Sequence, residues 1–186
     1  MSSRRLELTV ARLAPERWDD FLDLHSEANG AGWCRCVAWW VPTWEGWGDR
    51  SQAENTALRR ELCARGHNDG LLAYSGNEPV GWCQLGQRDR LTKLVAQFER
   101  DPDDRVWAVT CFLVAPAWRR RGVAGALLDA AVSTARDAGA HFLEGYPRVG
   151  ADEPGEIWTG SSGLFERAGF VVVRHGDGRS VVARAL

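Results

Sequence analysis

The spacing of apolar and polar residues predicts a chain that mixes strands with helices. Leu6–Leu13 alternates between the two classes, which is typical of a first strand. Apolar residues at helical spacing predict a helix from Pro15 to about Glu27. The pattern Ser51-Gln-Ala-Glu54 is a capping box and predicts a second helix that ends near Arg65.

The middle of the chain predicts a hairpin followed by a buried strand. Leu71–Ser75 and Val80–Leu85 flank the turn residues Gly76–Pro79, which indicates two antiparallel strands. Charged residues follow, with one short helix expected at about Leu91–Phe98. Val106–Val114 is apolar and rich in β-formers, so we expect it to lie at the centre of a sheet.

The last third predicts a long helix, two short elements and a closing pair of strands. The long helix should follow Pro116 and end at about Ala138, before Gly139. Its apolar face is Ala124, Leu127, Leu128, Ala131, Ala135 and Ala138. The elements expected after it are a strand over His141–Tyr146, a helix over about Ser161–Arg167, and strands over Phe170–Arg174 and Ser180–Arg184. We therefore expect one mixed α/β (α+β) domain over residues 1–186.

Composition narrows the function classes. A net charge of −2 argues against a general nucleic-acid binder. No apolar run resembles a signal peptide or approaches the roughly 20 residues of a membrane span. Five cysteines, an odd number scattered along 186 residues, argue against a disulfide framework and favour the cytoplasm.

The segment between the central strand and the long helix is suited to an anion. The first amides of a helix have no intrahelical partners, and the helix dipole adds positive charge there. Gly122 allows close approach of a ligand, and the three arginines 119–121 add charge. A phosphate-bearing ligand is one interpretation, and a turn with solvated arginines is the other. Neither a P-loop nor a dinucleotide fingerprint is present.

Two motifs carry a family resemblance. Val114-Ala-Pro-Ala-Trp-Arg-Arg-Arg-Gly-Val-Ala124 resembles the acetyl-CoA signature of the GNAT N-acetyltransferases, with Arg119, Gly122 and Ala124 at the three fixed positions. Phe165–Phe170 resembles that family's Tyr-Glu-Lys-x-Gly-Phe motif. Further segments are similar to a bacterial subgroup with no assigned acceptor: Trp33–Cys36, Gly81–Cys83, Val106–Phe112 and Leu143–Pro147.

The resemblance implies a fold and a cofactor site. The fold would be a mixed, mostly antiparallel sheet of six to seven strands flanked by about four helices, splayed between the fourth and fifth strands. The co-substrate would be acetyl-CoA, with its pantetheine along the backbone of Phe112, Leu113 and Val114. The amides from Arg121 to Ala126 would hold the pyrophosphate. The full predicted set is Phe112, Leu113, Val114, Arg119, Arg120, Arg121, Gly122, Val123, Ala124, Gly125 and Ala126.

The resemblance leaves the acid and the base open. Phe165 stands where many relatives have a proton-donating tyrosine, and Ala108 where some have a glutamate base. Tyr146 is the first substitute donor, or else a packing residue. Glu144 shares a strand face with Tyr146 by period two and is the candidate base, or else the partner of an arginine.

The tryptophan-rich region 29–50 lies where GNAT enzymes build the acceptor pocket. Trp33, Trp39 and Trp40 could stack on an acceptor, or pack as core and lid. Cys34-x-Cys36 has no second cysteine pair at zinc-site spacing, so no metal is expected.

Together these features predict transfer of an acetyl group from acetyl-CoA to an amine of a small molecule, by direct attack in a ternary complex. A protein or carrier-domain partner is one alternative, and a non-catalytic acyl-CoA sensor is another. A pocket closed by the Trp33–Trp47 loop would favour the small molecule, and an open groove the protein partner. If the chain self-associates, a second copy forming a homodimer is the remaining expected partner.

Overall fold

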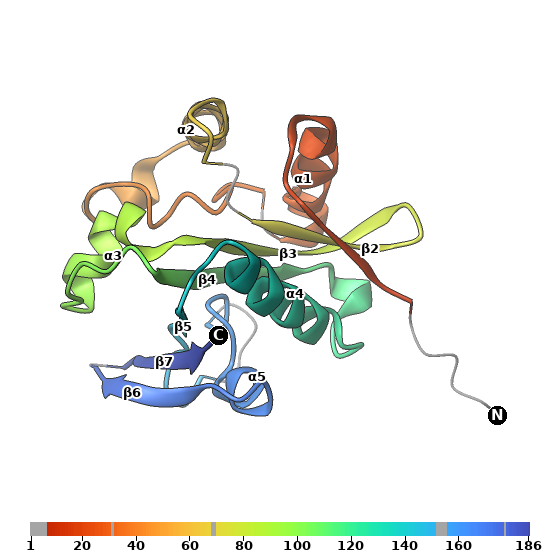
Figure 1. Cartoon of the computed structure of the whole chain (residues 1–186). Coiled ribbons are helices and arrows are strands. Elements are labelled where there is room, and N and C mark those ends of the chain that lie inside the picture. Colours follow the sequence, from red (N-terminus) through yellow and green to blue (C-terminus); the bar gives the residue numbers. More distant parts are fainter. Residues whose placement is uncertain (1–6, 31, 68–69, 152–155, 177) are drawn as a thin grey trace.

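A computed structural model describes residues 7–30, 32–67, 70–151, 156–176 and 178–186, so Leu6 of the expected first strand lies outside the described residues. Seven strands form one sheet in the order β1-β2-β3-β4-β5-β7-β6 (Figure 1). They are β1 (Thr9–Arg12), β2 (Leu71–Ser75), β3 (Glu78–Gln87), β4 (Val106–Val114), β5 (Phe142–Gly145), β6 (Val171–His175) and β7 (Ser180–Ala185). Among these described strands, only β4 and β5 pair in parallel. The predicted mixed, mostly antiparallel sheet is confirmed.

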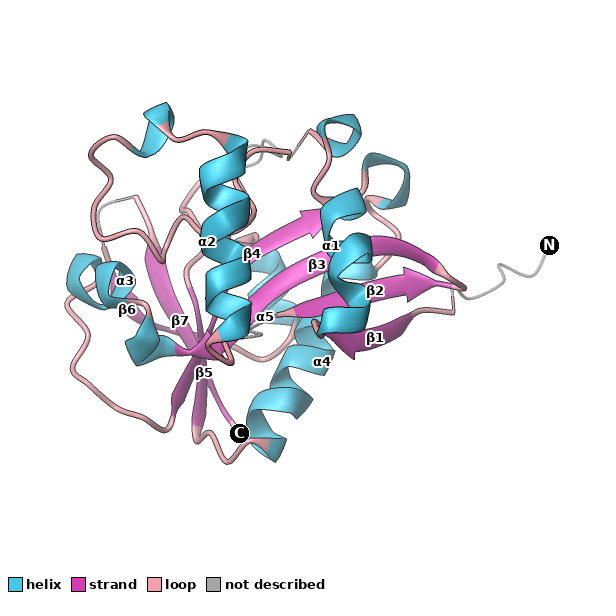
Figure 2. Ribbon diagram, turned by 90° about the horizontal axis from the view of Figure 1, so that it is seen from above, coloured by secondary structure: helices cyan, strands magenta, loops and turns pink. Residues whose placement is uncertain are grey.

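Helices cover both faces of this sheet (Figures 1 and 2). They are α1 (Trp18–Leu24), α2 (Gln52–Ala64), α3 (Thr92–Gln97), α4 (Val123–Asp137) and α5 (Ser162–Arg167). Alternation along β2 divides the core, because Leu71 and Ala73 pack with α4 while Leu72 packs with α1. None of the described helices is both long and apolar enough to cross a membrane.

The sheet opens between its fourth and fifth strands, as expected. The parallel pairing of β4 with β5 ends at Val109 and Gly145. The register of β3 against β4 shifts at the same level, between Gln84 and Leu85. Beyond this point the remaining residues of β4 leave β5, and the amide of Phe112 donates to the carbonyl of Trp158 at 2.6 Å. The edge of β4 therefore borders a gap.

Several element boundaries differ from the expectations. The first helix is a short 3-10 turn followed by α1, which ends at Leu24 rather than Glu27. The hairpin turn is only Gly76-Asn77, since β3 begins at Glu78. α4 ends at Asp137, so Ala138 follows the helix and is exposed, and Val123 and Val132 are buried instead because the buried face is rotated toward these larger side chains.

Candidate active site

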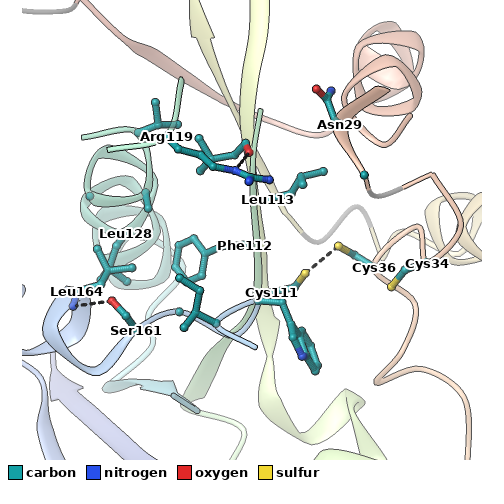
Figure 3. Close-up of a pocket in the computed structure, with 18 of the residues that line it drawn as sticks. Asn29, Cys34, Cys36, Cys111, Phe112, Leu113, Arg119, Leu128, Ser161 and Leu164 are labelled. Atoms are coloured by element: carbon teal, nitrogen blue, oxygen red, sulfur yellow. Dashed lines mark hydrogen bonds between the residues drawn. The ribbon is translucent and has the colours of Figure 1, made fainter. Parts of the chain in front are cut away.

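A cavity of about 1280 Å³ opens along the separated edge of β4. One end is bordered by the first turn of α4 and the preceding arginines. The other end is bordered by the loop between α1 and α2, with Cys111 and Phe112 of β4 between the two ends (Figure 3). The cavity thus joins the two regions to which the sequence assigns cofactor and acceptor.

The start of α4 presents backbone amides to the cavity. Gly122 adopts the left-handed conformation (φ +87°) and turns the chain into the helix. Val123, Ala124 and Gly125 occupy the first three helical positions and line the cavity, so their amides have no acceptor within the helix. The amide of Ala126 already donates to the carbonyl of Gly122 at 3.0 Å. Ala126 therefore drops out of the set of amides predicted to bind the anion.

Two of the three arginines face this end of the cavity. Arg119 and Arg120 line it, and Arg119 Nε donates to the Val114 carbonyl at 3.2 Å. Arg121 lies outside the lining, with its guanidinium 5.5 Å from the ring centroid of Trp118. Positive charge near the α4 amides thus comes from Arg119 and Arg120, while Arg121 is directed elsewhere.

The edge of β4 offers alternate residues to a ligand. Phe112, Leu113 and Val114 all line the cavity. Backbone groups of alternate residues point to the same side of a strand. Because the Phe112 amide points toward Trp158, Val114 faces the gap as well, whereas Leu113 faces its partner Trp82 in β3. Leu113 can therefore contribute its side chain to the cavity, and the backbone contribution falls to Val114 and the Phe112 carbonyl.

Tryptophans line the opposite end of the cavity. The lining ones are Trp33, Trp44, Trp47 and Trp158, besides Trp118 near the arginines. Trp33 and Trp44 expose 37% and 42% of their surface, so their rings are accessible to a ligand. Of the three tryptophans predicted to contact an acceptor, only Trp33 lies in the wall. Trp39 and Trp40 are outside it, because one is in the core and the other packs against His67.

The only lysine of the chain sits among these rings. Lys93 Nζ lies 3.5 Å from the centroid of Trp44, with Trp39 and Trp47 at 5.8 and 5.7 Å. Burial lowers the pKa of Lys93 from 10.5 to about 8.

Histidine and thiol groups form the wall between the two ends. His25 Nε2 is 3.3 Å from Cys36 Sγ, which is 2.9 Å from Cys111 Sγ (Figure 3). His25 Nδ1 is 2.9 Å from the carbonyl of Phe21, so in the neutral ring Nδ1 carries the proton and Nε2 accepts. The hydrogen bond with Cys111 raises the pKa of the Cys36 thiol well above its usual value, and burial adds to this. The Cys36 thiol is therefore protonated at neutral pH.

The two predicted catalytic groups are close together but lie outside the cavity lining. The Tyr146 hydroxyl donates to Glu144 Oε2 at 2.6 Å, and the two side chains do share one strand face. Both residues are at most 2% exposed. Glu144 also pairs with Arg88 at 3.3 Å and Arg100 at 2.6 Å. This geometry describes a neutralised buried network, which was the alternative interpretation for both residues, and a catalytic role for them stays a prediction.

The two positions where relatives have an acid and a base are also buried. Phe165 and Ala108 are both 0% exposed. The Phe165 ring fills the space over Gly145 and Gly160, where an added Cβ would lie 2.3 and 2.6 Å from it. Ser161, which does line the cavity, caps α5 by accepting from the amide of Leu164 at 3.3 Å. Within the described part of the chain, no three His, Cys, Asp or Glu side chains are arranged to hold a metal ion.

The structure adds lining residues that the sequence did not single out. Trp158 and Arg179 reach the cavity from the loop after β5 and from the turn before β7. They come from irregular segments, where periodicity gives no orientation. His25 also lines the cavity, and only its packing beside Cys36 in the fold places it there.

Comparisons with known proteins agree with this geometry. The sequence model of the acetyltransferase (GNAT) family matches residues 33–152. No curated protein matches the chain.

Solved structures share the fold. A GNAT-family acetyltransferase from Listeria monocytogenes superposes with a TM-score of 0.62 at 15% identity, covering 100% of this chain and 99% of that one. PaiA N-acetyltransferase from Thermoplasma acidophilum, in complex with coenzyme A, gives 0.60 at 11% identity, with coverages of 97% and 99%. The yncA protein from Salmonella typhimurium, with its cofactor acetyl-CoA, gives 0.54 at 17% identity, with coverages of 96% and 92%.

Proposed function

We propose that this chain, which belongs to the GNAT family of acetyltransferases, transfers an acetyl group from acetyl-CoA to the amine of a small molecule. The family match confirms the resemblance inferred from Arg119, Gly122 and Ala124. Two proteins of the same fold hold coenzyme A or acetyl-CoA in their structures, which supports acetyl-CoA as the donor here.

The observation that carries the proposal is the continuity of the cavity from the α4 amides to the tryptophans. Val123, Ala124 and Gly125, with Arg119 and Arg120, form the end that suits a pyrophosphate. The edge of β4 runs from there toward the tryptophan wall, so a pantetheine bonded to Val114 would bring its thioester to the acceptor end.

The acetyl donor supplies an activated thioester, and the chain holds the thioester and the amine in position to react. An unprotonated amine held among the tryptophans would attack the carbonyl carbon, and the C–S bond would break to release coenzyme A. Between its two ends the cavity wall contains the Cys36 thiol and the His25 imidazole in their neutral forms, and the one carboxylate of the described lining, Asp129, lies on α4 at the cofactor end. Such a site favours an amine that enters uncharged, with water carrying its proton away.

The wall formed by Trp33, Trp44 and Trp47 supports a small-molecule acceptor over a protein or carrier domain. These side chains belong to the loop that the sequence singled out as the cover of a small-molecule pocket. A sensor without turnover is distinguished by coenzyme A release with a panel of amines.

Gly122→Ala tests the cofactor end. A Cβ at Gly122 meets nothing within 4 Å in the protein, and Gly122 lines the cavity at the end where we expect the pyrophosphate. The control is Gly139→Ala at the other end of α4, where φ is +82° and the space is equally open. Both variants should lose about 1 kcal/mol of stability from the left-handed backbone. Only Gly122→Ala should weaken acetyl-CoA binding in calorimetry, by tenfold or more. Equal affinities in the two variants would contradict the assignment.

A further inference from the structure

One cation in the acceptor end of the cavity has no carboxylate partner among the described residues. Arg179 Nη1 donates to Thr159 Oγ1 at 2.8 Å and, at 3.4 Å, to the carbonyl of Tyr146. Its guanidinium lies 5.3 Å from the ring centroid of Trp158. These contacts hold the group in place, and none of the described carboxylates matches its charge.

The neighbouring arginine does not share this situation. The backbones of Arg148 and Arg179 form an isolated antiparallel β-bridge, but the guanidinium of Arg148 pairs with Glu156 at 3.0 Å. Burial lowers the pKa of Arg179, and the charge of Arg148 lowers it further. A partly desolvated arginine beside another cation is stabilised when an anion binds it.

Arg179 lies away from the phosphate end. Its stacking partner Trp158 accepts the hydrogen bond from Phe112, on the strand edge beyond Val114. Trp158 in turn packs against the core residue Trp39 at 6.0 Å, and the Trp39 ring lies 5.1 Å from that of Trp44 in the tryptophan wall. The guanidinium is therefore placed beside the acceptor and not beside the α4 amides.

The charges around the cavity favour an acidic acceptor. Its described lining includes a single acidic residue, Asp129, which lies on α4 at the cofactor end. At the acceptor end the described lining offers aromatic faces and a cation, and none of its described residues is a carboxylate that could hold an ammonium group. Such surroundings attract a carboxylate, accept an aromatic ring and favour the neutral form of an amine.

We propose that the acceptor is an amino-carboxylate with an aromatic side chain, such as an aromatic amino acid, whose carboxylate is bound by Arg179. The ring of the acceptor packs on the exposed tryptophans Trp33 and Trp44. The amine attached beside the carboxylate then faces the thioester at the edge of β4. This inference rests on the proposed acetyl transfer and specifies its substrate class.

Matched amines with and without the carboxylate test the proposal. Coenzyme A release is measured with L-tryptophan against tryptamine and with L-phenylalanine against phenethylamine. The wild-type protein should prefer the amino acid of each pair. Arg179→Gln should lower kcat/KM for the amino acids by about 10- to 100-fold while changing it little for the plain amines. Arg148→Gln, which removes a neighbouring charge outside the cavity lining, should preserve the preference.

The outcomes distinguish an error in the substrate class from an error in the proposed acetyl transfer. Preference for the plain amines, an equal loss with both members of a pair in Arg179→Gln, or no turnover of any amino acid overturns the substrate class. Calorimetry with acetyl-CoA tests the proposed acetyl transfer separately, because failure of the wild-type protein to bind acetyl-CoA overturns the proposed function itself. An acetyl-CoA affinity that falls in Arg179→Gln would place the arginine at the cofactor instead and also overturn the inference.

Discussion

At pH 7 the imidazole of His25 is neutral, and acidification to pH 5 should destabilise the protein through this side chain. His25 is 1% exposed and is held by the Phe21 carbonyl on one side and Cys36 on the other. Burial lowers its pKa from 6.5 to about 3, and the charges of Arg59 and Arg35 contribute in the same direction. The folded protein therefore resists protonation at this ring.

The sign and size follow from proton linkage. Between pH 6.5 and about 3 the unfolded chain binds a proton at His25 that the folded protein does not. Stability from this group is complete above pH 6.5 and is lost progressively as the pH falls. From pH 7 to pH 5 the loss is about 2 kcal/mol, and the limit at still lower pH is about 5 kcal/mol.

Urea unfolding, followed by tryptophan fluorescence at pH 7 and pH 5, measures this loss. His25→Gln keeps a polar side chain that does not titrate in this range, so its stability should fall less on acidification. The wild-type protein should lose about 2 kcal/mol more than the variant, equivalent to roughly 1 M in the urea midpoint. Equal losses in both proteins would refute the argument. If the variant does not fold, an NMR titration in which the His25 ring protonates near pH 6.5 would refute it equally.

Two further predictions concern buried positions near the site. Gly145→Ala should cost about 1–3 kcal/mol, because the new methyl group would lie 2.3 Å from the Phe165 ring, whereas Gly48→Ala has open space and should be nearly neutral in thermal unfolding. Tyr146→Phe removes the hydroxyl that donates to Glu144 and should cost about 1–3 kcal/mol in urea unfolding. A tenfold fall in kcat without this loss of stability would instead support the catalytic hypothesis for Tyr146.

The fold could be predicted from sequence wherever a pattern determined both the element and its exposed side. The limits of β4 match the apolar run Val106–Val114 residue for residue. The capping box forms as expected, with the Glu54 amide donating to Ser51 Oγ at 3.2 Å and the Ser51 amide to Glu54 Oε2 at 2.7 Å. The opening between β4 and β5 came from the family resemblance, since no local pattern specifies where two strands separate.

The acceptor end was harder to predict because the periodicity and spacing of residues do not indicate how deeply a side chain is buried. Glu144 and Tyr146 were placed correctly on one face, but α3 and the residues around it cover that face. The charged segment that supplies Arg88 and Arg100 was visible in the sequence, although its partner was not. Similarly, tryptophans of one irregular loop can point to the core or to the cavity. Only the fold shows that Trp39 lies in the core and Trp33 in the cavity wall.

The tryptophan cage around Lys93 also affects what an acetyltransferase can do to itself. A lysine ε-amine is an ordinary target of acetylation, and this chain has one. That amine is enclosed by three indole rings on a residue that is only 6% exposed. Every other Lys-or-Arg position of the sequence is arginine, whose guanidinium stays protonated and does not react as an amine at neutral pH. The chain thus exposes no lysine side chain to acetylation by its own acetyl-CoA.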